Sequence, residues 1–361
     1  MHNTINISSH IKDYTVHFHG INDPGYKALF ATHNIAVVDQ NVYDLYGHCS
    51  DTFGKLSHII TQEAAETVKT AETSLKICNK LLRIGFKRGD SILVIGGGVI
   101  QDIMTFASSI LFRGISWTFV PTTLLAQADS CIGGKSSLNM GQWKNQIGNF
   151  YPPQNICIVS DYLKTLTEQD IRSGIGEILK VHLISGMDSV EYIDQNFPDS
   201  EPLRDKAMYR ALSMKATMIM KDEFDSGPRL TYNFGHTFGH ALEAATHFGM
   251  PHGIAVTIGA DFANYMAAKI GHISEDQYQF LNSIHEKNIR KSDCVKVDKN
   301  IFFDALKHDK KNTSNAYCFI LPISLGTVEK TYLPFDEKTD SLIQSYFSKV
   351  YGKYSEALEP A

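Results

Sequence analysis

Cysteine is sparse and unpaired along this chain, which limits the kinds of protein it can be. Its six cysteines include no CxxC pair, so they provide neither a disulfide framework nor a thiolate zinc site. Scattered thiols of this kind are typical of a reducing cytosol. The N-terminal stretch MHNTINISSHIKDY also lacks the charged-then-apolar pattern of a secretory signal. We therefore expect a cytoplasmic protein.

Long apolar runs and an excess of positive charge are missing as well. No run approaches the roughly 18 apolar residues that span a bilayer, so we expect no membrane segment. The 34 Lys and Arg residues are outnumbered by 39 Asp and Glu residues, which argues against nucleic acid as a partner. A local cationic pocket for a small anionic substrate remains compatible with this balance. We find no internal repeat and no low-complexity tract.

The first half of the chain alternates apolar runs with helical stretches. The runs that we expect to form strands are 35–42, ending in a polar loop, 91–98, 115–123 and 156–161. Residues 63–85 and the stretch after the glycines at 96–98 have helical periodicity. Strands separated by helices predict a parallel sheet, and ligands gather at the carboxyl ends of such strands.

After about residue 170 strand-like runs become rare, and amphipathic segments dominate residues 168–289. Only residues 317–326 look strongly extended. A chain of 361 residues is long for one core, so we expect two domains, 1–170 and 171–361. Thr167, near this boundary, can cap a helix. The polar tail after about Tyr351 is expected to fray.

The densest chemistry lies in the run NFGHTFGH, which is followed by His252 in PHGIAV. His236 and His240 are four residues apart and share one face if the run is helical. Upstream, Glu177 and Lys180 share a face of GIGEILK. One carboxylate with two or three imidazoles suits catalytic zinc or a similar divalent ion, with one position open for substrate. Spacing leaves a second interpretation open, in which some of these histidines are hydrogen-bonded core or surface residues.

Glycine-rich turns offer candidate phosphate sites. The glycines at 96–98 follow a predicted strand and precede a helix, so their N–H groups can approach a pyrophosphate, although a tight structural turn is the alternative. Asp39 and Asn41, after the first strand, could hydrogen-bond a ribose or adenine, or simply cap a loop. The segment DSCIGGKSSLNMGQWKN brings Asp129 and Lys135 to a GGK turn that does not match a Walker A loop.

Further charged residues follow these turns. Lys144 and Asn145 end the GGK segment, and Lys215 and the pair at 310–311 come later. Arg229 lies seven residues before His236, so a helical or turn continuation would bring it near the metal, and its guanidinium suits a carboxylate or phosphate. Solvated loop charges are the alternative interpretation for each of these residues.

Together these motifs resemble the 3-dehydroquinate synthase family of sugar phosphate cyclases over roughly residues 35–325. The segments that carry the resemblance, in chain order, are GGGVIQD, RGISWTFVPTTLLAQADSCIGGK, WKNQIGNFYPP, GIGEILK, RLTYNFGHTFGH and PHGIAV. The resemblance implies an α/β, Rossmann-like NAD-binding domain at the N-terminus and a mostly α-helical, metal-binding domain at the C-terminus. It places the active site in the cleft between them.

By position, the resemblance implies that Glu177, His236 and His252 bind Zn2+, with Co2+ as an alternative, and that His240 contacts substrate instead. The residues implied for catalysis are Lys180, Asp129, His240, Lys135, Lys215, Arg229 and Asn233. Those implied for further substrate contacts are Lys144, Asn145, Arg113, Lys310 and Lys311. Those implied for NAD binding are Asp39, Asn41, Glu66, Lys69, Gly96, Gly97, Gly98, Asp102, Thr122, Thr123, Lys144 and Thr165. Arg113 resembles an arginine that reaches the neighbouring subunit's phosphate, which implies a homodimer.

The activity implied is a carbon–oxygen lyase of the shikimate pathway, which serves aromatic amino acid biosynthesis. It converts 3-deoxy-D-arabino-heptulosonate 7-phosphate to 3-dehydroquinate and phosphate. NAD takes up and returns a hydride in this reaction, and zinc polarises the reacting oxygen.

Three departures from the family pattern leave the substrate open. Ile254 stands where Glu is common in HGEAV, the loop SSLNMGQW replaces TxxNHPxG, and Gln101 with residues 103–105 replaces smaller residues. The alternatives are a secondary-metabolism cyclase (amino-dehydroquinate, 2-epi-5-epi-valiolone or 2-deoxy-scyllo-inosose synthase type), a metal- and NAD-dependent alcohol or glycerol dehydrogenase, and an inactive binding protein. Retention of Lys215, Arg229 and Asn233 favours a carboxylated substrate.

Overall fold

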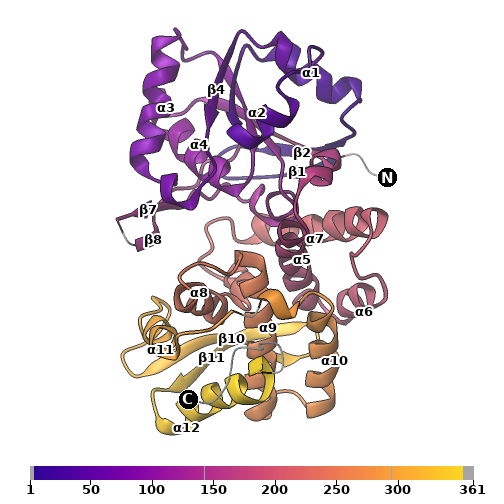
Figure 1. Ribbon diagram of the computed structural model, residues 1–361, viewed down its shortest axis with the longest axis vertical. Coiled ribbons are helices and arrows are strands. Elements are labelled where there is room, and N and C mark those ends of the chain that lie inside the picture. Colours follow the sequence, from indigo (N-terminus) through magenta and orange to yellow (C-terminus); the bar gives the residue numbers. More distant parts are fainter. Residues whose placement is uncertain (1–3, 142, 294, 353–361) are drawn as a thin grey trace. The chain divides into compact units, whose positions relative to one another are not determined.

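The computed structural model describes residues 4–141, 143–293 and 295–352 (Figure 1). Its contacts divide the chain into two compact units. Unit 1 comprises Met1–Thr167 with Lys215–Asp225, and unit 2 comprises Glu168–Met214 with Ser226–Ala361. The segment Lys215–Asp225, which the sequence assigns to the second domain, groups with unit 1. Residues 353–361, where the tail was expected to fray, lie outside the described residues.

Unit 1 is built on a seven-stranded sheet in the order β1-β2-β9-β6-β5-β3-β4. Its strands are β1 (Thr4–Ile7), β2 (Tyr14–His19), β3 (Ile35–Asp39), β4 (His58–Gln62), β5 (Ser91–Gly96), β6 (Ser116–Pro121) and β9 (Asn155–Val159). Its helices are α1 (Pro24–Thr32), α2 (Gln40–Tyr46), α3 (Ala71–Arg83) and α4 (Gly98–Ile110), and a small hairpin joins β7 (Leu138–Met140) to β8 (Trp143–Ile147). Only the β1–β2 pair in the seven-stranded sheet is antiparallel; its other neighbours are parallel, as predicted.

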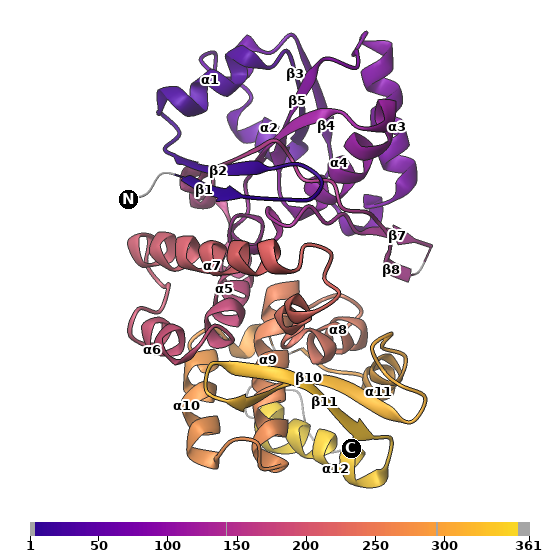
Figure 2. The same ribbon diagram turned by 180° about the vertical axis from the view of Figure 1, so that it is seen from behind.

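Helices cover both faces of this sheet. Because successive strand residues point to opposite faces, Ala36 and Val38 of β3 share one face, and they pack with Tyr26 and Phe30 of α1. Helix α4 packs against β5, β6 and α3, and α1 and α3 lie on opposite sides of the sheet in both views (Figures 1 and 2). Strands β3, β5, β6 and β9 are buried along nearly their whole length and form continuous apolar runs, which is why the sequence predicted them.

Two element boundaries in unit 1 differ from the prediction. The first predicted strand ends at Asp39, and helix α2 starts at once, because the Asp39 carboxylate accepts the Asn41 N–H at 3.0 Å and caps the helix. Helix α3 begins at Ala71 rather than near residue 63, since Thr70 caps it by accepting the Thr73 N–H. The β1–β2 hairpin, strand β4 and the β7–β8 pair were not predicted.

Unit 2 is mostly helical, as predicted. Its helices are α5 (Glu168–Leu183), α6 (Met187–Gln195), the first part of α7 (Glu201–Lys221), α8 (His236–Ala245), α9 (His252–Lys269), α10 (Glu275–Glu286), α11 (Lys299–Lys307) and α12 (Glu337–Tyr346). Strands β10 (Ala316–Ser324) and β11 (Thr327–Pro334) form an antiparallel hairpin. Strand β11 was missed because most of its side chains are at least partly exposed and it carries no apolar run.

Helix α9 forms the core of unit 2. It is buried along nearly its whole length and packs against α5, α8, α10 and β10 (Figure 2). Its buried polar side chains need partners among these neighbours, and Asp261 accepts from Asn282 at 3.0 Å and from Tyr346 at 2.8 Å. Across the described residues, no helix has both the length and the apolar character that crossing a membrane requires.

Two fully buried histidines are expected to make unit 2 sensitive to acid. The imidazole of His182 contacts the carbonyl oxygen of Ala207 at 3.1 Å, and that of His285 contacts the carbonyl oxygen of Leu281 at 2.9 Å. Burial lowers the pKa of His182 to about 4 and that of His285 to about 4. The fold therefore favours the neutral imidazole, and the unfolded chain binds protons first as the pH falls.

Stability is accordingly expected to fall as the pH drops from about 6.5 to about 4, by up to roughly 3 kcal/mol for each histidine. The substitution His285→Gln, which cannot be protonated in this range, should remove about half of that decline. Urea unfolding at a series of pH values measures this decline. His308→Gln is the matched control, because His308 is exposed and directly follows α11. An unchanged pH profile in His285→Gln contradicts the prediction.

Candidate metal centre and cofactor edge

Glycines allow the backbones of α5 and α9 to touch where the two helices cross, next to two of the predicted ligands. A Cβ atom added to Gly253 would lie 1.7 Å from the carbonyl oxygen of Ser173, and one added to Gly176 would lie 2.0 Å from the carbonyl oxygen of Gly253. No side chain other than hydrogen fits there. Glu177 directly follows Gly176, and His252 directly precedes Gly253. The close crossing therefore brings a carboxylate and an imidazole together.

Helix α8 approaches α9 in the same way. A Cβ atom on Gly259 would lie 2.2 Å from the carbonyl oxygen of Gly235. Gly235 itself has φ +77, a left-handed conformation that favours glycine, and it directly precedes α8. The helix therefore starts at His236, and the turn containing Arg229 does not continue into it, contrary to one of the expectations from sequence.

The predicted ligands converge within unit 2. Nε2 of His252 lies 3.4 Å from Oε1 of Glu177, and Nε2 of His236 lies 3.7 Å from the same oxygen. His236 and His240 share one face of α8, with ring centroids 5.4 Å apart. One nitrogen from each of the three histidines lies within 4.8 Å of the others. The shared helix face expected from the four-residue spacing is confirmed.

These distances fit a divalent ion. Two ligand atoms at about 2.1 Å from a tetrahedral ion are about 3.4 Å apart, close to the two distances from Glu177 to His236 and His252. Glu177 contributes negative charge and the imidazoles contribute neutral nitrogen donors, a combination suited to zinc or cobalt. The geometry gathers Glu177 and three histidines, so it accommodates His240 as a ligand as well as the predicted set.

Lys180 determines the charge state of Glu177. Its Nζ lies 2.5 Å from Oε2 of Glu177, one helical turn away on α5, and both side chains are buried. Burial alone would raise the pKa of Glu177, but Lys180 and the imidazoles of His252 and His236 bring it well below its ordinary value. Burial and Lys180 lower the pKa of His236, which keeps that imidazole neutral. Both groups are thus in the form that binds metal.

Glu243, which the sequence did not single out, contacts the centre through His252. Oε2 of Glu243 lies 3.1 Å from Nδ1 of His252. Burial opposes a charge on this imidazole, but hydrogen bonds to Glu177 and Glu243 raise the pKa of His252 to about 10. A sequence signal existed, since Glu243 lies seven residues after His236 and hence on the same face of α8.

Other predicted residues of unit 2 are close to α8. Nζ of Lys311 donates to the hydroxyl of Thr237 at 2.7 Å, whereas Lys310 is exposed. Arg229 is buried in the short 3-10 turn Pro228–Asn233, and the amide of Asn233 donates to a carbonyl of that turn at 3.1 Å. Of the two lysines at 310 and 311, only Lys311 is therefore held against the helix that carries His236.

Two predicted lysines of unit 1 are paired with carboxylates. Buried Lys215 donates to the backbone oxygen of Asp129 at 2.6 Å and pairs with its carboxylate at 2.9 Å. Lys135 pairs with Asp225, which the sequence did not single out. Gln101, one of the departures from the family pattern, donates to the carbonyl oxygen of Ser130 at 2.6 Å and so ties α4 to the segment that carries Asp129.

The glycine turn of unit 1 is shaped for close approach. Gly97 precedes α4 at the carboxyl end of β5, and a Cβ atom there would lie 2.9 Å from the side chain of Thr123. Thr122 donates its N–H to the carbonyl oxygen of Gly96 at 3.0 Å, which joins the ends of β6 and β5. This is the edge at which α/β folds bind nucleotides, next to a helix N-terminus.

Lys69 gathers several of the predicted polar residues of unit 1. Its Nζ lies 3.2 Å from Glu66, 3.3 Å from Asp102 and 2.9 Å from the amide oxygen of Asn145. Burial raises the pKa of Asp102 to about 7, against the effect of Lys69. Asn145, which was expected to bind substrate, thus contacts a group of residues that were expected to bind NAD.

The remaining predicted residues of unit 1 are spread along the sheet edge and its loops. Asp39 caps α2, so its structural role is established whether or not it binds a nucleotide, and Asn41 is exposed. The hydroxyl of Thr165, after β9, donates to a carbonyl of its own turn at 3.2 Å. Lys144 lies on β8, partly buried, and Arg113 is exposed with φ +65.

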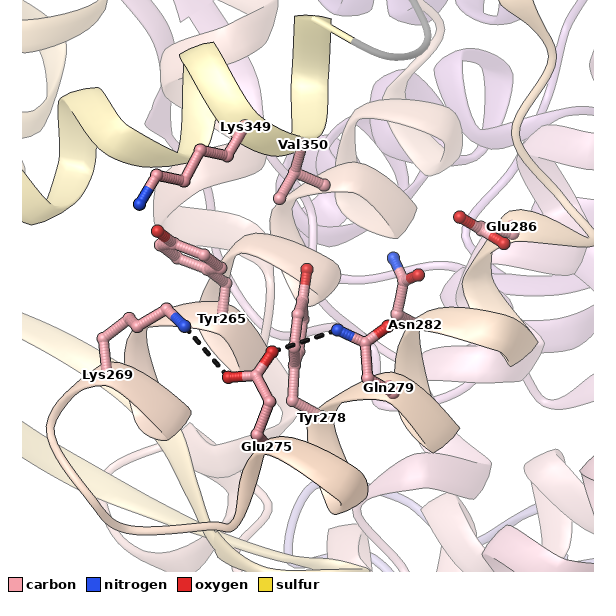
Figure 3. Close-up of a pocket in the computed structure, with 9 residues that line it drawn as sticks. All are labelled: Tyr265, Lys269, Glu275, Tyr278, Gln279, Asn282, Glu286, Lys349 and Val350. Atoms are coloured by element: carbon pink, nitrogen blue, oxygen red, sulfur yellow. Dashed lines mark hydrogen bonds and ion pairs between the residues drawn. The ribbon is translucent and has the colours of Figure 1, made fainter.

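A pocket in unit 2 lies apart from all these residues. It is lined by side chains of α9, α10 and the C-terminal turn, among them Tyr265, Glu275 and Lys349 (Figure 3). None of the predicted site residues lines it. We therefore base the candidate site on the Glu177 cluster and the sheet edge rather than on this hollow.

Unit 1 has a parallel sheet with a glycine turn, and unit 2 has a cluster of one carboxylate and several imidazoles. This combination defines a class of α/β proteins with a candidate nucleotide-binding site and a candidate metal centre. The models for the N-terminal and C-terminal parts of 3-dehydroquinate synthase match residues 59–173 and 174–312. The chain belongs to the 3-dehydroquinate synthase family, which confirms the family and the fold class expected from its motifs.

Similar proteins match most of the chain. A 3-dehydroquinate synthase of Alkaliphilus metalliredigens is 34% identical over 313 residues, which is 84% of this chain and 87% of that protein. A 3-dehydroquinate synthase of Streptococcus pyogenes is 31% identical over 361 residues, which is 95% of this chain and 100% of that protein. The crystal structure of a 2-deoxy-scyllo-inosose synthase complexed with carbaglucose-6-phosphate, NAD+ and Co2+ has a TM-score of 0.83 at 24% identity and covers 95% and 98% of the two chains. That last likeness shows the fold.

Proposed function

We propose that this chain converts 3-deoxy-D-arabino-heptulosonate 7-phosphate to 3-dehydroquinate with release of phosphate, as a lyase of the shikimate pathway. The observation that carries the proposal is the cluster of Glu177, His236 and His252, with buried Lys180, in a chain that belongs to this family. When bound, NAD would accept and return a hydride, and Zn2+ or Co2+ would act as a Lewis acid on the reacting oxygen.

In unit 2, we assign metal binding to Glu177, His236 and His252. Lys180 holds Glu177 ionised at 2.5 Å, which fixes the carboxylate's charge and direction. His240 is exposed beside the other two rings and is assigned to substrate, where its imidazole can hold or move a proton. The residues of unit 2 assigned to the anionic groups of the substrate are Arg229, Asn233, Lys310 and Lys311.

In unit 1, we assign NAD to the sheet edge around the glycine turn, because Gly97 precedes α4 at the carboxyl end of β5, where backbone N–H groups can approach a pyrophosphate. The residues assigned to NAD are Asp39, Asn41, Glu66, Lys69, Gly96, Gly97, Gly98, Asp102, Thr122, Thr123, Lys144 and Thr165. Asp129, Lys135, Lys144, Asn145 and Lys215 are assigned to substrate. The ion pair with Asp129 already neutralises Lys215, so the burial of Lys215 does not by itself require a substrate carboxylate.

We further propose a cytoplasmic homodimer in which Arg113 reaches the neighbouring subunit's substrate. Phe112 and Arg113 have φ +52 and +65, a backbone conformation that costs energy in residues other than glycine and often marks functional loops. Arg113 is exposed, so its guanidinium is available to a second chain. The described cysteines are free thiols, which supports a reducing compartment.

The proposal predicts catalytic phosphate release without net reduction of NAD. Purified chain with NAD, Zn2+ and 3-deoxy-D-arabino-heptulosonate 7-phosphate should release many phosphates per chain, while absorbance at 340 nm shows no accumulating NADH. Metal-free protein is the control. Absence of phosphate release would contradict the proposal, and NADH that accumulates with product would instead indicate a dehydrogenase.

A second candidate is a cyclase for an amino or non-carboxylated sugar phosphate. The fold likeness to the 2-deoxy-scyllo-inosose synthase, at a TM-score of 0.83, favours this class, but identity to that enzyme is 24% against 34% to a 3-dehydroquinate synthase. A panel of sugar phosphates with and without a carboxylate, read by phosphate release, separates the two. Preference for glucose 6-phosphate or sedoheptulose 7-phosphate would establish the second candidate.

A further inference from the structure

We infer that Glu243 is a positioning residue for the metal centre, which holds His252 in the orientation and tautomer that bind the ion. The inference rests on the metal site of the proposed function and not on its substrate. Oε2 of Glu243 lies 3.1 Å from Nδ1 of His252, while Nε2 of the same imidazole lies 3.4 Å from Oε1 of Glu177. The two ring nitrogens thus face two different carboxylates.

The chemistry of imidazole determines which ring nitrogen of His252 binds the ion. A neutral histidine carries one N–H and one lone pair, and a carboxylate at one nitrogen fixes the proton there. When an ion displaces one proton from His252, the contact with Glu243 therefore keeps the proton on Nδ1 and leaves the lone pair on Nε2. That is the nitrogen beside Glu177, where the ion would bind. Carboxylates that orient metal-binding histidines in this way also increase the basicity of the ligand nitrogen.

Helix α8 places Glu243 for this purpose. His236, His240 and Glu243 lie at positions i, i+4 and i+7, so all three project from one face. Glu243 is buried and thus fixed in place. The same helix face therefore supplies one proposed ligand and the group that orients another ligand on α9.

Zn2+ affinity, measured by competition with a chromogenic chelator, tests the inference without any catalytic assay. Glu243→Gln keeps an acceptor oxygen but loses the charge, and Glu243→Ala loses both. We expect affinity to fall roughly 10- to 100-fold in the alanine variant and by less in the glutamine variant. Glu275→Gln is the control, because Glu275, at the start of α10, pairs with Lys269 at the end of α9 at 2.9 Å and contacts none of the proposed ligands.

Unchanged Zn2+ affinity in both variants would overturn the inference. So would a change in coordination number in the visible spectrum of the Co2+-loaded glutamine variant, since Glu243 would then be a ligand itself. If the variants fail to fold by circular dichroism, nitrogen-15 NMR of the unaltered chain labelled at histidine decides. A proton retained on Nδ1 of His252 with Zn2+ at Nε2 supports the inference, and Zn2+ at Nδ1 overturns it. If the unaltered chain has no cyclase activity with any substrate, the proposed function is wrong, but the inference about Glu243 still stands on the zinc affinities.

Discussion

Replacing His252 by alanine is expected to remove stoichiometric zinc and to lower turnover at least about a thousandfold. His252 supplies one of the three atoms grouped around the predicted ion, with Nε2 3.4 Å from Glu177. A metal ion that stabilises developing charge contributes several kcal/mol to the reaction, and about 4 kcal/mol corresponds to a factor of a thousand. Metal analysis after dialysis, together with phosphate release, measures both effects.

The same substitution at His240 is the matched comparison. If Glu177, His236 and His252 are the ligands, His240→Ala should keep its zinc and lose activity, because it acts on the substrate. The carboxylate variant Glu177→Gln should lose zinc, since the amide carries no charge. The opposite pattern, with zinc lost in His240→Ala and retained in Glu177→Gln, would establish three histidines as the ligands, an arrangement that the 4.8 Å cluster also permits.

Much of the fold could be predicted because its strands are buried on both faces and its helices are periodic. The apolar runs that became β3, β5, β6 and β9 needed no knowledge of their neighbours. Strand β11 and the β1–β2 hairpin expose more of their side chains, so no apolar run marked them. Helix α2 was hidden for a different reason, because its first residues continue a strand and only the Asp39 cap separates the two elements.

The site was predictable where one helix carries two partners and obscure where a contact joins separate helices. The spacing of His236 and His240 and that of Glu177 and Lys180 follow from helix geometry alone. The partner of Glu243, by contrast, is an imidazole on the next helix, and the pairing depends on how α8 and α9 cross. Asp225 was missed because its partner Lys135 is 90 residues away in sequence, and neither residue lies on a helix whose spacing could indicate the pair.

Replacing Gly253 by alanine is expected to lower the free energy of unfolding by at least about 3 kcal/mol and to weaken zinc binding. The new Cβ atom would lie 1.7 Å from the carbonyl oxygen of Ser173, a backbone atom that cannot rotate away. Overpacking that displaces backbone reaches or exceeds the upper end of the usual cost of about 1 to 3 kcal/mol. Because α5 and α9 would have to separate there, Glu177 and His252 would also move apart.

Gly89→Ala provides the control, since a Cβ atom at Gly89 would meet nothing within 4 Å and should change stability by less than about 0.5 kcal/mol. Urea unfolding measures stability, and chelator competition measures zinc affinity in whatever fraction remains folded. A Gly253→Ala variant that matches the control in both would show that the helices can separate without disturbing the ligands. If the binding free energy of zinc falls by more than the free energy of unfolding, the close contact between α5 and α9 at the glycines holds the metal ligands in place.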